Sequence, residues 1–130
     1  MMPETSETPI QVLVVDDQER FRTVLRELVD GLDGMAVAGD ASSGEDALLA
    51  AERLRPQLVV MDVRMPGMNG IEATRRLVDE HPGTVVLLVS ADSADESDRL
   101  QGCGAAGFLP KQRLSRAALA EFWREHGSGG

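Results

Sequence analysis

Apolar residues along the chain follow two patterns, short continuous runs and stripes with helical spacing. Short runs bounded by turn residues indicate buried strands, whereas apolar positions three and four residues apart indicate one face of a helix. Strands are expected near 10–15, 35–39, 57–61, 84–89 and 105–109. Helices are expected near 19–31, 43–54, 70–80, 94–103 and 114–125. The pattern therefore predicts five successive strand–helix units.

The first expected helix has the clearest apolar stripe. Its large apolar residues fall at positions i, i+3, i+4, i+7 and i+8, namely Phe21, Val24, Leu25, Leu28 and Val29. Two later helix starts are marked by a capping residue followed three positions later by glutamate: Ser42 with Glu45, and Asn69 with Glu72. Such side-chain oxygens accept hydrogen bonds from the unpaired N–H groups of a first helical turn.

The expected strands near 57–61 and 84–89 show no polar alternation, which indicates burial on both faces. A parallel sheet covered by helices on each side has this property. Right-handed crossovers with one reversal of winding then give a doubly wound, flavodoxin-like α/β fold with the strand order 2-1-3-4-5. In such folds the functional site lies beyond the carboxyl ends of the strands, next to the point where the winding reverses.

Carboxylates follow two of the expected strands. Asp16 and Asp17 come directly after the first strand, and Asp62 ends the third and leads into a loop rich in Pro and Gly. Because these strands are neighbours in the predicted order, the three carboxylates should converge. Two carboxylates roughly 4 Å apart repel by about 4 kcal/mol at an effective dielectric constant of 20, so a cation is needed between them. Oxygen ligands alone favour a hard ion, and we expect Mg²⁺ in preference to Ca²⁺.

The last two strands contribute a hydroxyl group and an ammonium group at the same edge. Ser90 follows the fourth strand, and Lys111 follows the fifth. Both groups suit a phosphoryl oxygen, because one donates a hydrogen bond and the other supplies a compact positive charge. A Gly-rich Walker loop is absent from the sequence, so binding of a nucleoside triphosphate is not expected.

Composition indicates one globular domain in a chain of 130 residues, of which 42% are hydrophobic. We expect the domain over 10–126, with a flexible lead-in at 1–9 and a flexible tail at 127–130. No apolar stretch is long enough to span a membrane, and the acidic N-terminal segment does not resemble a secretion signal. Cys103 is the single cysteine and is expected to be a buried thiol, which suits a reducing cytoplasm.

The net charge of −9 disfavours direct binding to nucleic acid, which depends on clustered basic residues. The nearest candidates for such a cluster, Arg75 with Arg76 and Arg113 with Arg116, are interpreted as solvated charges on helix surfaces. The two histidines, His81 and His126, are far apart in the sequence. They are expected to be surface residues that supply no pair of metal ligands.

These residues together resemble the receiver domain of two-component response regulators, over about residues 10–123. The resemblance rests on the acidic pair Asp16-Asp17, on the 61–70 segment that contains Asp62, on Ser90-Ala91 and on Lys111. The stretches 65–73 and 104–111 are most similar to receivers of regulators that carry helix-turn-helix output domains.

The resemblance implies transfer of a phosphoryl group from the phosphohistidine of a sensor histidine kinase to Asp62. It also implies a Mg²⁺ ion bound by Asp17, Asp62 and the backbone carbonyl of Arg64, with Asp16 acting through water. Positioning and charge neutralisation carry most of the catalysis in such transfers. The chain would then be a signalling switch, possessing no enzyme activity other than promoting its own phosphorylation and dephosphorylation.

The resemblance further implies a switch in which Ser90 is drawn to the phosphoryl group and the ring of Phe108 moves inward. This change would reshape the surface of the fourth helix, fifth strand and fifth helix and so control an output domain or partner, including transcription regulation. The acidic 92–98 segment has little to bury, so the fourth helix is expected to be mobile. Trp123 is expected to help form a homodimer or partner surface.

Two other functional classes are considered. A Mg²⁺-dependent phosphatase with an aspartyl nucleophile would have a second Asp two residues after the first, but Arg64 stands there. A pseudo-receiver that acts as a phosphorylation-independent interaction module is expected to lack at least one of the key site residues. Asp17, Asp62 and Lys111 are all present, which favours a working receiver.

Overall fold

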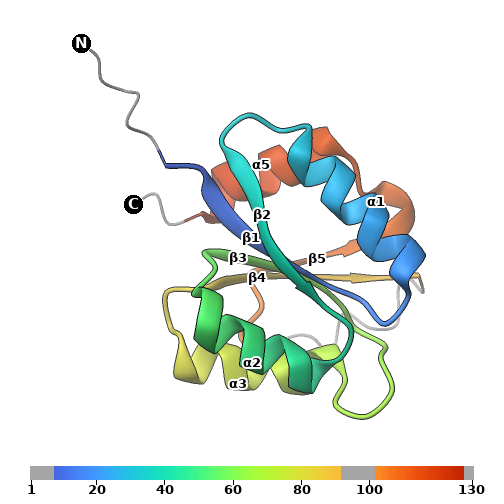
Figure 1. Ribbon diagram of the computed structural model, residues 1–130, viewed down its shortest axis with the longest axis vertical. Coiled ribbons are helices and arrows are strands. Elements are labelled where there is room, and N and C mark those ends of the chain that lie inside the picture. The colour runs from blue at the N-terminus through green and yellow to red at the C-terminus, as the bar shows by residue number, and fades with distance from the viewer. Residues whose placement is uncertain (1–7, 92–101, 128–130) are drawn as a thin grey trace.

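The computed structural model describes residues 8–91 and 102–127. Five parallel strands form one sheet in the order β2-β1-β3-β4-β5 (Figure 1). Their bounds are β1 Ile10–Val15, β2 Met35–Ala41, β3 Leu58–Asp62, β4 Val85–Ser90 and β5 Gly107–Pro110. The predicted strand order and the doubly wound α/β class are confirmed.

Helices cover both faces of the sheet (Figure 1). Their bounds are α1 Glu19–Asp30, α2 Gly44–Leu54, α3 Gly70–Glu80, the short 3₁₀ helix η3 Lys111–Arg113 and α5 Arg116–His126. Figure 1 shows α1 and α5 on one face and α2 and α3 on the other. The winding therefore reverses between β1 and β3, which places the expected functional site at the carboxyl ends of these two strands.

The central strands build a core on each face because their side chains alternate in direction. In β1 and β3, Leu13 and Val59 point to the face covered by α2 and α3, whereas Val12 and Val60 point to the face covered by α1 and α5. All four side chains are fully buried. Burial of both faces explains the continuous apolar runs from which the strands were predicted.

The predicted cap of α3 is confirmed, and the predicted cap of α2 is wrong by one residue. The Asn69 side chain accepts a hydrogen bond from the Glu72 N–H at 3.0 Å. At α2 it is Ser43, not Ser42, that accepts from the Asp46 N–H, also at 3.0 Å. Ser43 has the extended backbone that an N-cap requires, whereas the Ser42 hydroxyl lies 3.4 Å from the Asp46 carboxylate.

The apolar stripe of α1 is narrower than its sequence spacing suggests. Leu25 and Val29 are fully buried, and Phe21 and Leu28 are partly buried. Val24 is 41% exposed, so its predicted place in the core is wrong. The helix presents Leu25 and Val29 directly to the sheet, and Val24 lies to the side of this line of contact.

Most element bounds agree with the predictions to within one residue, and the clearest differences lie near β2 and β5. β2 continues to Ala41, and β5 begins at Gly107, two residues later than predicted. The helix expected over 114–125 begins at Arg116, because the Ser115 side chain accepts from the Ala118 N–H at 3.0 Å and caps it there. The preceding η3 helix was not predicted.

Several predictions fall outside the described residues. They include most of the fourth helix expected near 94–103, its mobility, and most of the lead-in and tail. Gly102 and Cys103 are described and form a turn, and Cys103 is buried as predicted. None of the helices in the described ranges combines the length and the apolar character that a membrane crossing requires.

Candidate functional site

Three strand ends meet at the carboxyl edge of the sheet. Asp16 directly follows β1 and is fully buried, and Asp62 is the last residue of β3 and is 6% exposed. Lys111 begins η3, directly after β5. Its Nζ atom lies 3.0 Å from Asp16 Oδ2 and 3.3 Å from Asp62 Oδ2. The ammonium therefore bridges two buried carboxylates that come from neighbouring strands.

Asp17 completes an acidic group at this edge. Asp16, Asp17 and Asp62 each offer a carboxylate oxygen, and the three oxygens lie within 4.8 Å of one another. Asp16 Oδ2 is buried and, among the described residues, accepts no hydrogen bond beyond its ion pair with Lys111. Three carboxylates face one ammonium, so the pocket keeps excess negative charge. Oxygen donors with unused capacity fit a hard divalent cation such as Mg²⁺.

The surroundings shift the pKa values of the two central groups. Burial, and next the nearby charge of Asp16, raise the pKa of Asp62 to about 6, although Lys111 and a hydrogen bond from the Arg64 N–H oppose the shift. Burial by itself would lower the pKa of Lys111. Its hydrogen bond with Asp16 and the charges of Asp62 and Asp16 outweigh burial and raise that pKa. Lys111 is therefore a stable cation at neutral pH.

The loop after β3 brings the start of α3 directly onto the backbone of Asp62. A Cβ atom at Gly70 would lie 2.4 Å from the Asp62 carbonyl oxygen, closer than any real side chain can pack. The Gly70 N–H donates to the Val63 carbonyl at 2.8 Å, and the Gly70 carbonyl accepts from the Thr74 hydroxyl at 2.7 Å. Glycine at this position thus permits the contact that fixes Asp62.

Ser90 lies at the same sheet edge, as predicted. It is the last residue of β4, is fully buried and pairs with Pro110 of β5, the residue before Lys111. Phe108 lies two residues earlier in β5, where it is partly buried and packs against the core on the face covered by α2 and α3. The structure thus brings the predicted acidic and basic residues together at the carboxyl edge of the sheet. Ser90 lies at this edge as the last residue of β4, and Phe108 lies within β5.

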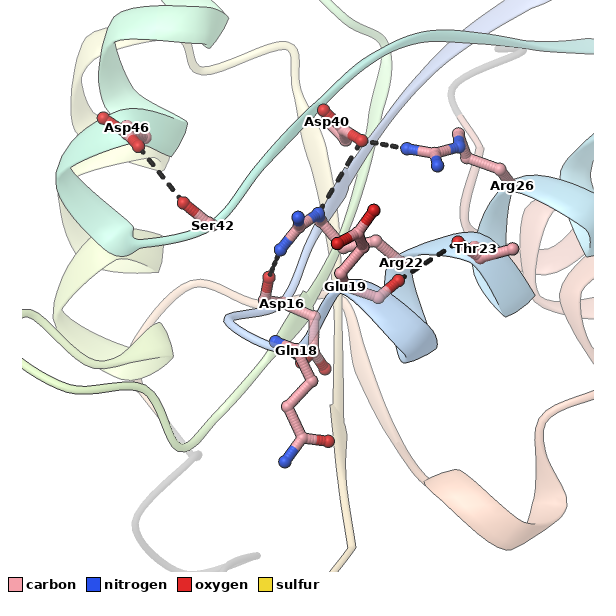
Figure 2. Close-up of polar contacts among 9 residues, drawn as sticks. All are labelled: Asp16, Gln18, Glu19, Arg22, Thr23, Arg26, Asp40, Ser42 and Asp46. Atoms are coloured by element: carbon pink, nitrogen blue, oxygen red, sulfur yellow. Dashed lines mark hydrogen bonds and ion pairs between the residues drawn. The ribbon is translucent and has the colours of Figure 1, made fainter.

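Arg22 of α1 supports the site and was not predicted from the sequence. Its Nη1 atom donates to the Asp16 carbonyl at 2.7 Å, and its Nε atom lies 3.7 Å from Asp40 Oδ2 (Figure 2). Asp40 also pairs with Arg26. The Gln18 N–H donates to Asp16 Oδ1 at 2.8 Å. Figure 2 shows Arg22 lying between the Asp16 loop and β2, so α1 holds the acidic loop in place.

Phe21 is a second contributor that sequence reasoning placed only in the apolar stripe. The Lys111 Nζ atom lies 4.1 Å from the centroid of the Phe21 ring. A cation near the face of an aromatic ring is attracted by the negative potential of that face. Phe21 therefore helps to position the ammonium between the two carboxylates. A sequence signal for this contact does not exist, since it depends on how α1 lies against η3.

Most of the arginines and histidines predicted to lie at the surface are exposed, but one histidine is not. Arg75, Arg76, Arg113 and Arg116 are exposed, as predicted. The prediction for His126 is also confirmed, with a side chain 39% exposed. The prediction for His81 is wrong, because its side chain is only 9% exposed. It lies beside Glu52 and Glu80, and the three side chains form a group of possible metal ligands. His81 directly follows α3, which contacts α2.

The comparisons identify the family. Residues 12–122 match the family described as "Response regulator receiver domain". The chain belongs to this family, and it is therefore a receiver domain of two-component signalling, a signalling switch. Receiver domains generally bind Mg²⁺ in an acidic pocket and interact with histidine kinases and effector domains.

Named relatives support the predicted subclass. Response regulator GacA of Pseudomonas protegens is 47% identical over 103 residues, which is 78% of this chain and 48% of that protein. Transcriptional regulatory protein DegU of Brevibacillus brevis is 33% identical over 132 residues, which is 100% of this chain and 55% of that protein. The predicted similarity to receivers of transcription regulators is confirmed. The chain spans about half the length of these relatives.

A solved structure agrees with this assignment. The signal receiver domain of the putative response regulator NarL from Mycobacterium tuberculosis superimposes with a TM-score of 0.85 at 28% sequence identity. The match covers 94% of this chain and 98% of that chain. The similarity thus extends over nearly the whole chain.

Proposed function

We propose that Asp62 accepts a phosphoryl group from the phosphohistidine of a sensor histidine kinase. The observation that supports this most directly is the buried Asp62 carboxylate, with Lys111 Nζ 3.3 Å away and two further carboxylates beside it. A carboxylate oxygen attacks phosphorus in line, and an acyl phosphate forms. The bond from phosphorus to the histidine nitrogen breaks, and its electron pair stays on the imidazole.

Mg²⁺ is the cofactor that these residues suit. We propose Asp17, Asp62 and the Arg64 backbone carbonyl as its ligands, with Asp16 acting through water. When bound, the ion neutralises phosphoryl and carboxylate oxygens as charge redistributes. The support is the oxygen-only donor set and the buried Asp16 Oδ2, which has no hydrogen-bond or ion-pair partner other than Lys111 within the described residues.

Lys111 and Ser90 are proposed to receive the phosphoryl group. Phosphorylation adds a charge of about −1.5 to −2 at neutral pH to a pocket that is already acidic. The Lys111 ammonium forms an ion pair with the Asp62 carboxylate and can offset part of the added negative charge. Ser90 ends the strand next to Asp62, and its hydroxyl would donate to a phosphoryl oxygen and orient it.

The output is proposed to run through Ser90 and Phe108 to the surface of the fourth helix, β5 and α5. β5 and α5 border a surface hollow of about 290 Å³ lined in part by Phe108, Leu109 and Phe122. Movement of the Phe108 ring would change the shape of this hollow. We propose that a homodimer or a downstream effector domain or protein binds this surface. Trp123, which is partly buried against the core, is the proposed aromatic contact.

We also propose the domain bounds, the cellular location and the limits of the activity of this switch. The receiver domain would span 10–126, act in the cytoplasm and make no direct contact with nucleic acid or membrane, consistent with the net charge of −9. Its catalysis would be confined to its own phosphorylation and dephosphorylation. Arg64, two residues after Asp62, offers no carboxylate to act as the general acid of a phosphatase. Transcription regulation would require an output domain or partner.

Intact-mass measurement after incubation with acetyl phosphate and Mg²⁺ tests the proposal. The native chain should gain one phosphoryl group, and Asp62→Asn should gain none. Asp79→Asn is the matched control, because Asp79 is an exposed acid on α3 away from the pocket. A chelator should prevent the gain. A folded native chain that gains no mass from acetyl phosphate or from a phosphorylated histidine kinase would instead support the phosphorylation-independent interaction module.

A further inference from the structure

A second group of possible metal ligands lies at the opposite edge of the sheet. Glu52 is in the last turn of α2, Glu80 ends α3, and His81 directly follows it. Each offers one ligand atom, and the three atoms lie within 4.8 Å of one another. α2 and α3 lie side by side on one face and lead into the amino ends of β3 and β4 (Figure 1). The group is thus far from the carboxyl-edge pocket.

His81 gives this group its chemical character. Its side chain is only 9% exposed, and its Nε2 atom is buried without a hydrogen-bond partner among the described residues. Buried polar atoms normally have a partner, so this atom has the capacity to bind an ion, a ligand or a water molecule. The backbone holds the residue firmly: the His81 N–H donates to the Leu77 carbonyl at 2.7 Å, and the His81 carbonyl accepts from the Thr84 N–H at 2.9 Å.

The spacing suits a transition metal. His81 Nε2 lies 3.5 Å from Glu52 Oε1. Two ligands about 2.0–2.2 Å from a tetrahedral zinc ion are roughly 3.3–3.6 Å apart, so this pair needs little movement to share one ion. The other carboxylate oxygen of Glu52 is 3.9 Å from an Arg55 nitrogen, which leaves Oε1 directed at the imidazole.

The local field also favours a cation. The carboxyl ends of α2 and α3 converge here, and each helix end carries partial negative charge from its unpaired carbonyls. Glu52 and Glu80 add two carboxylates. One imidazole with two carboxylates is a donor set that suits Zn²⁺ and similar ions, whereas Mg²⁺ prefers oxygen ligands and retains its waters.

We propose that Glu52, Glu80 and His81 form a binding site for a divalent transition metal ion of the Zn²⁺ type. Three protein ligands leave a fourth position for water. The bound ion links the ends of α2 and α3 at the edge remote from Asp62, so it acts independently of the acidic pocket. The competing explanation is a protonated His81 that forms an ion pair with Glu52 and binds no metal.

Calorimetric titration of the chain with Zn²⁺ tests the site, with excess Mg²⁺ present to compete for the oxygen ligands of the carboxyl-edge pocket. One equivalent of Zn²⁺ should bind, and ¹⁵N spectra of the imidazoles should show a shift of the His81 Nε2 signal. Glu52→Gln and His81→Gln should weaken binding by at least about tenfold, as loss of a ligand or its support does. His126→Gln should bind Zn²⁺ like the native chain, since His126 belongs to α5.

The outcomes separate metal binding from an ion pair. If the chain does not saturate with Zn²⁺ and the His81 Nε2 signal does not shift, the contact between His81 and Glu52 is an ion pair only. This result would overturn the proposal. Equal Zn²⁺ affinity in Glu52→Gln and the native chain would also overturn it. Glu52 is 65% exposed, so its replacement tests the site even where His81→Gln disturbs folding.

Discussion

The carboxyl edge and the amino edge of the sheet each carry a group of acidic residues, and the two groups differ in which side chains are buried. At the carboxyl edge, Asp16 and Asp62 are buried and face the ammonium of Lys111. At the amino edge the carboxylates are exposed, and the buried member is the imidazole of His81. Buried carboxylates interact strongly with their surroundings, whereas exposed ones are screened by water. The presence of acidic residues in a sequence therefore says little about function until their burial is known.

The largest expected effect comes from removing the basic partner at the carboxyl edge. Lys111→Ala leaves two buried carboxylates without their counter-charge, so the free energy of unfolding without Mg²⁺ should fall by about 3 kcal/mol. Arg55→Ala removes an ion pair whose two side chains are 68% and 65% exposed and should cost less than about 1 kcal/mol. Urea unfolding with a chelator measures both. Similar losses in the two variants would contradict the contrast between the edges.

The backbone at the two edges should tolerate a methyl group differently. Gly70→Ala places a Cβ atom 2.4 Å from the Asp62 carbonyl oxygen, so stability should fall by about 1–3 kcal/mol and phosphorylation by acetyl phosphate should slow. Gly83, in the loop beside His81, has open space around its Cβ position. Gly83→Ala should change neither quantity measurably. Native stability of the Gly70→Ala chain would contradict this prediction, because it would show that the loop after β3 shifts at little cost to accommodate the methyl group.

The pH dependence of stability should distinguish Asp62 from Glu52. Folding raises the pKa of Asp62 from its usual 3.8 to about 6, mainly through burial, so the native state binds this proton more tightly than the unfolded state. The stability that the proton provides is complete below about pH 4 and is lost as the pH rises through 6. Asp62→Asn without Mg²⁺ should therefore be more stable than the native chain at pH 7, by about 1–3 kcal/mol.

Denaturant unfolding across this pH range, with a chelator present, measures the difference. The gain from Asp62→Asn should shrink as the pH falls from 7 to 4. Glu52→Gln should show no comparable gain at any of these pH values, because the Glu52 side chain is 65% exposed. A constant difference between Asp62→Asn and the native chain would argue against the raised pKa.

The smallest effect is expected at the aromatic contact with Lys111. Phe21→Leu keeps an apolar side chain but removes the ring 4.1 Å from the ammonium, which should cost about 0.5–1 kcal/mol and lower the phosphorylation rate severalfold. Val24→Ala on the same helix is the control, since Val24 is 41% exposed. Stopped-flow phosphorylation with acetyl phosphate compares the two. A Phe21→Leu rate equal to the native rate would remove Phe21 from the site.

The sequence was most informative where local pattern and tertiary position coincide. Asp16, Asp62 and Lys111 were found because each lies at or directly after the end of an apolar strand, and parallel strands end at a common edge. Arg22 and Phe21 were missed because their contacts depend on the angle at which α1 crosses the sheet. Helical spacing alone does not encode that angle.

Two other errors have local physical causes. Ser42 and Ser43 are adjacent, and each stands three residues before an acid, so spacing does not decide which one caps α2. The backbone conformation of Ser43 decides it. His81 looked isolated because its neighbour Glu52 lies on a different helix. The cluster forms only when α2 and α3 pack together.

Lys111 has one more consequence, for labelling. It is the single lysine among the 130 residues, and it lies in the acidic pocket. Reductive methylation with ¹³C-formaldehyde keeps the positive charge of a lysine and introduces one NMR signal per labelled side chain. In this chain such a label would give one side-chain signal, apart from the α-amino group, and that signal would come from within the pocket. The pocket therefore carries its own spectroscopic reporter, without any engineered residue.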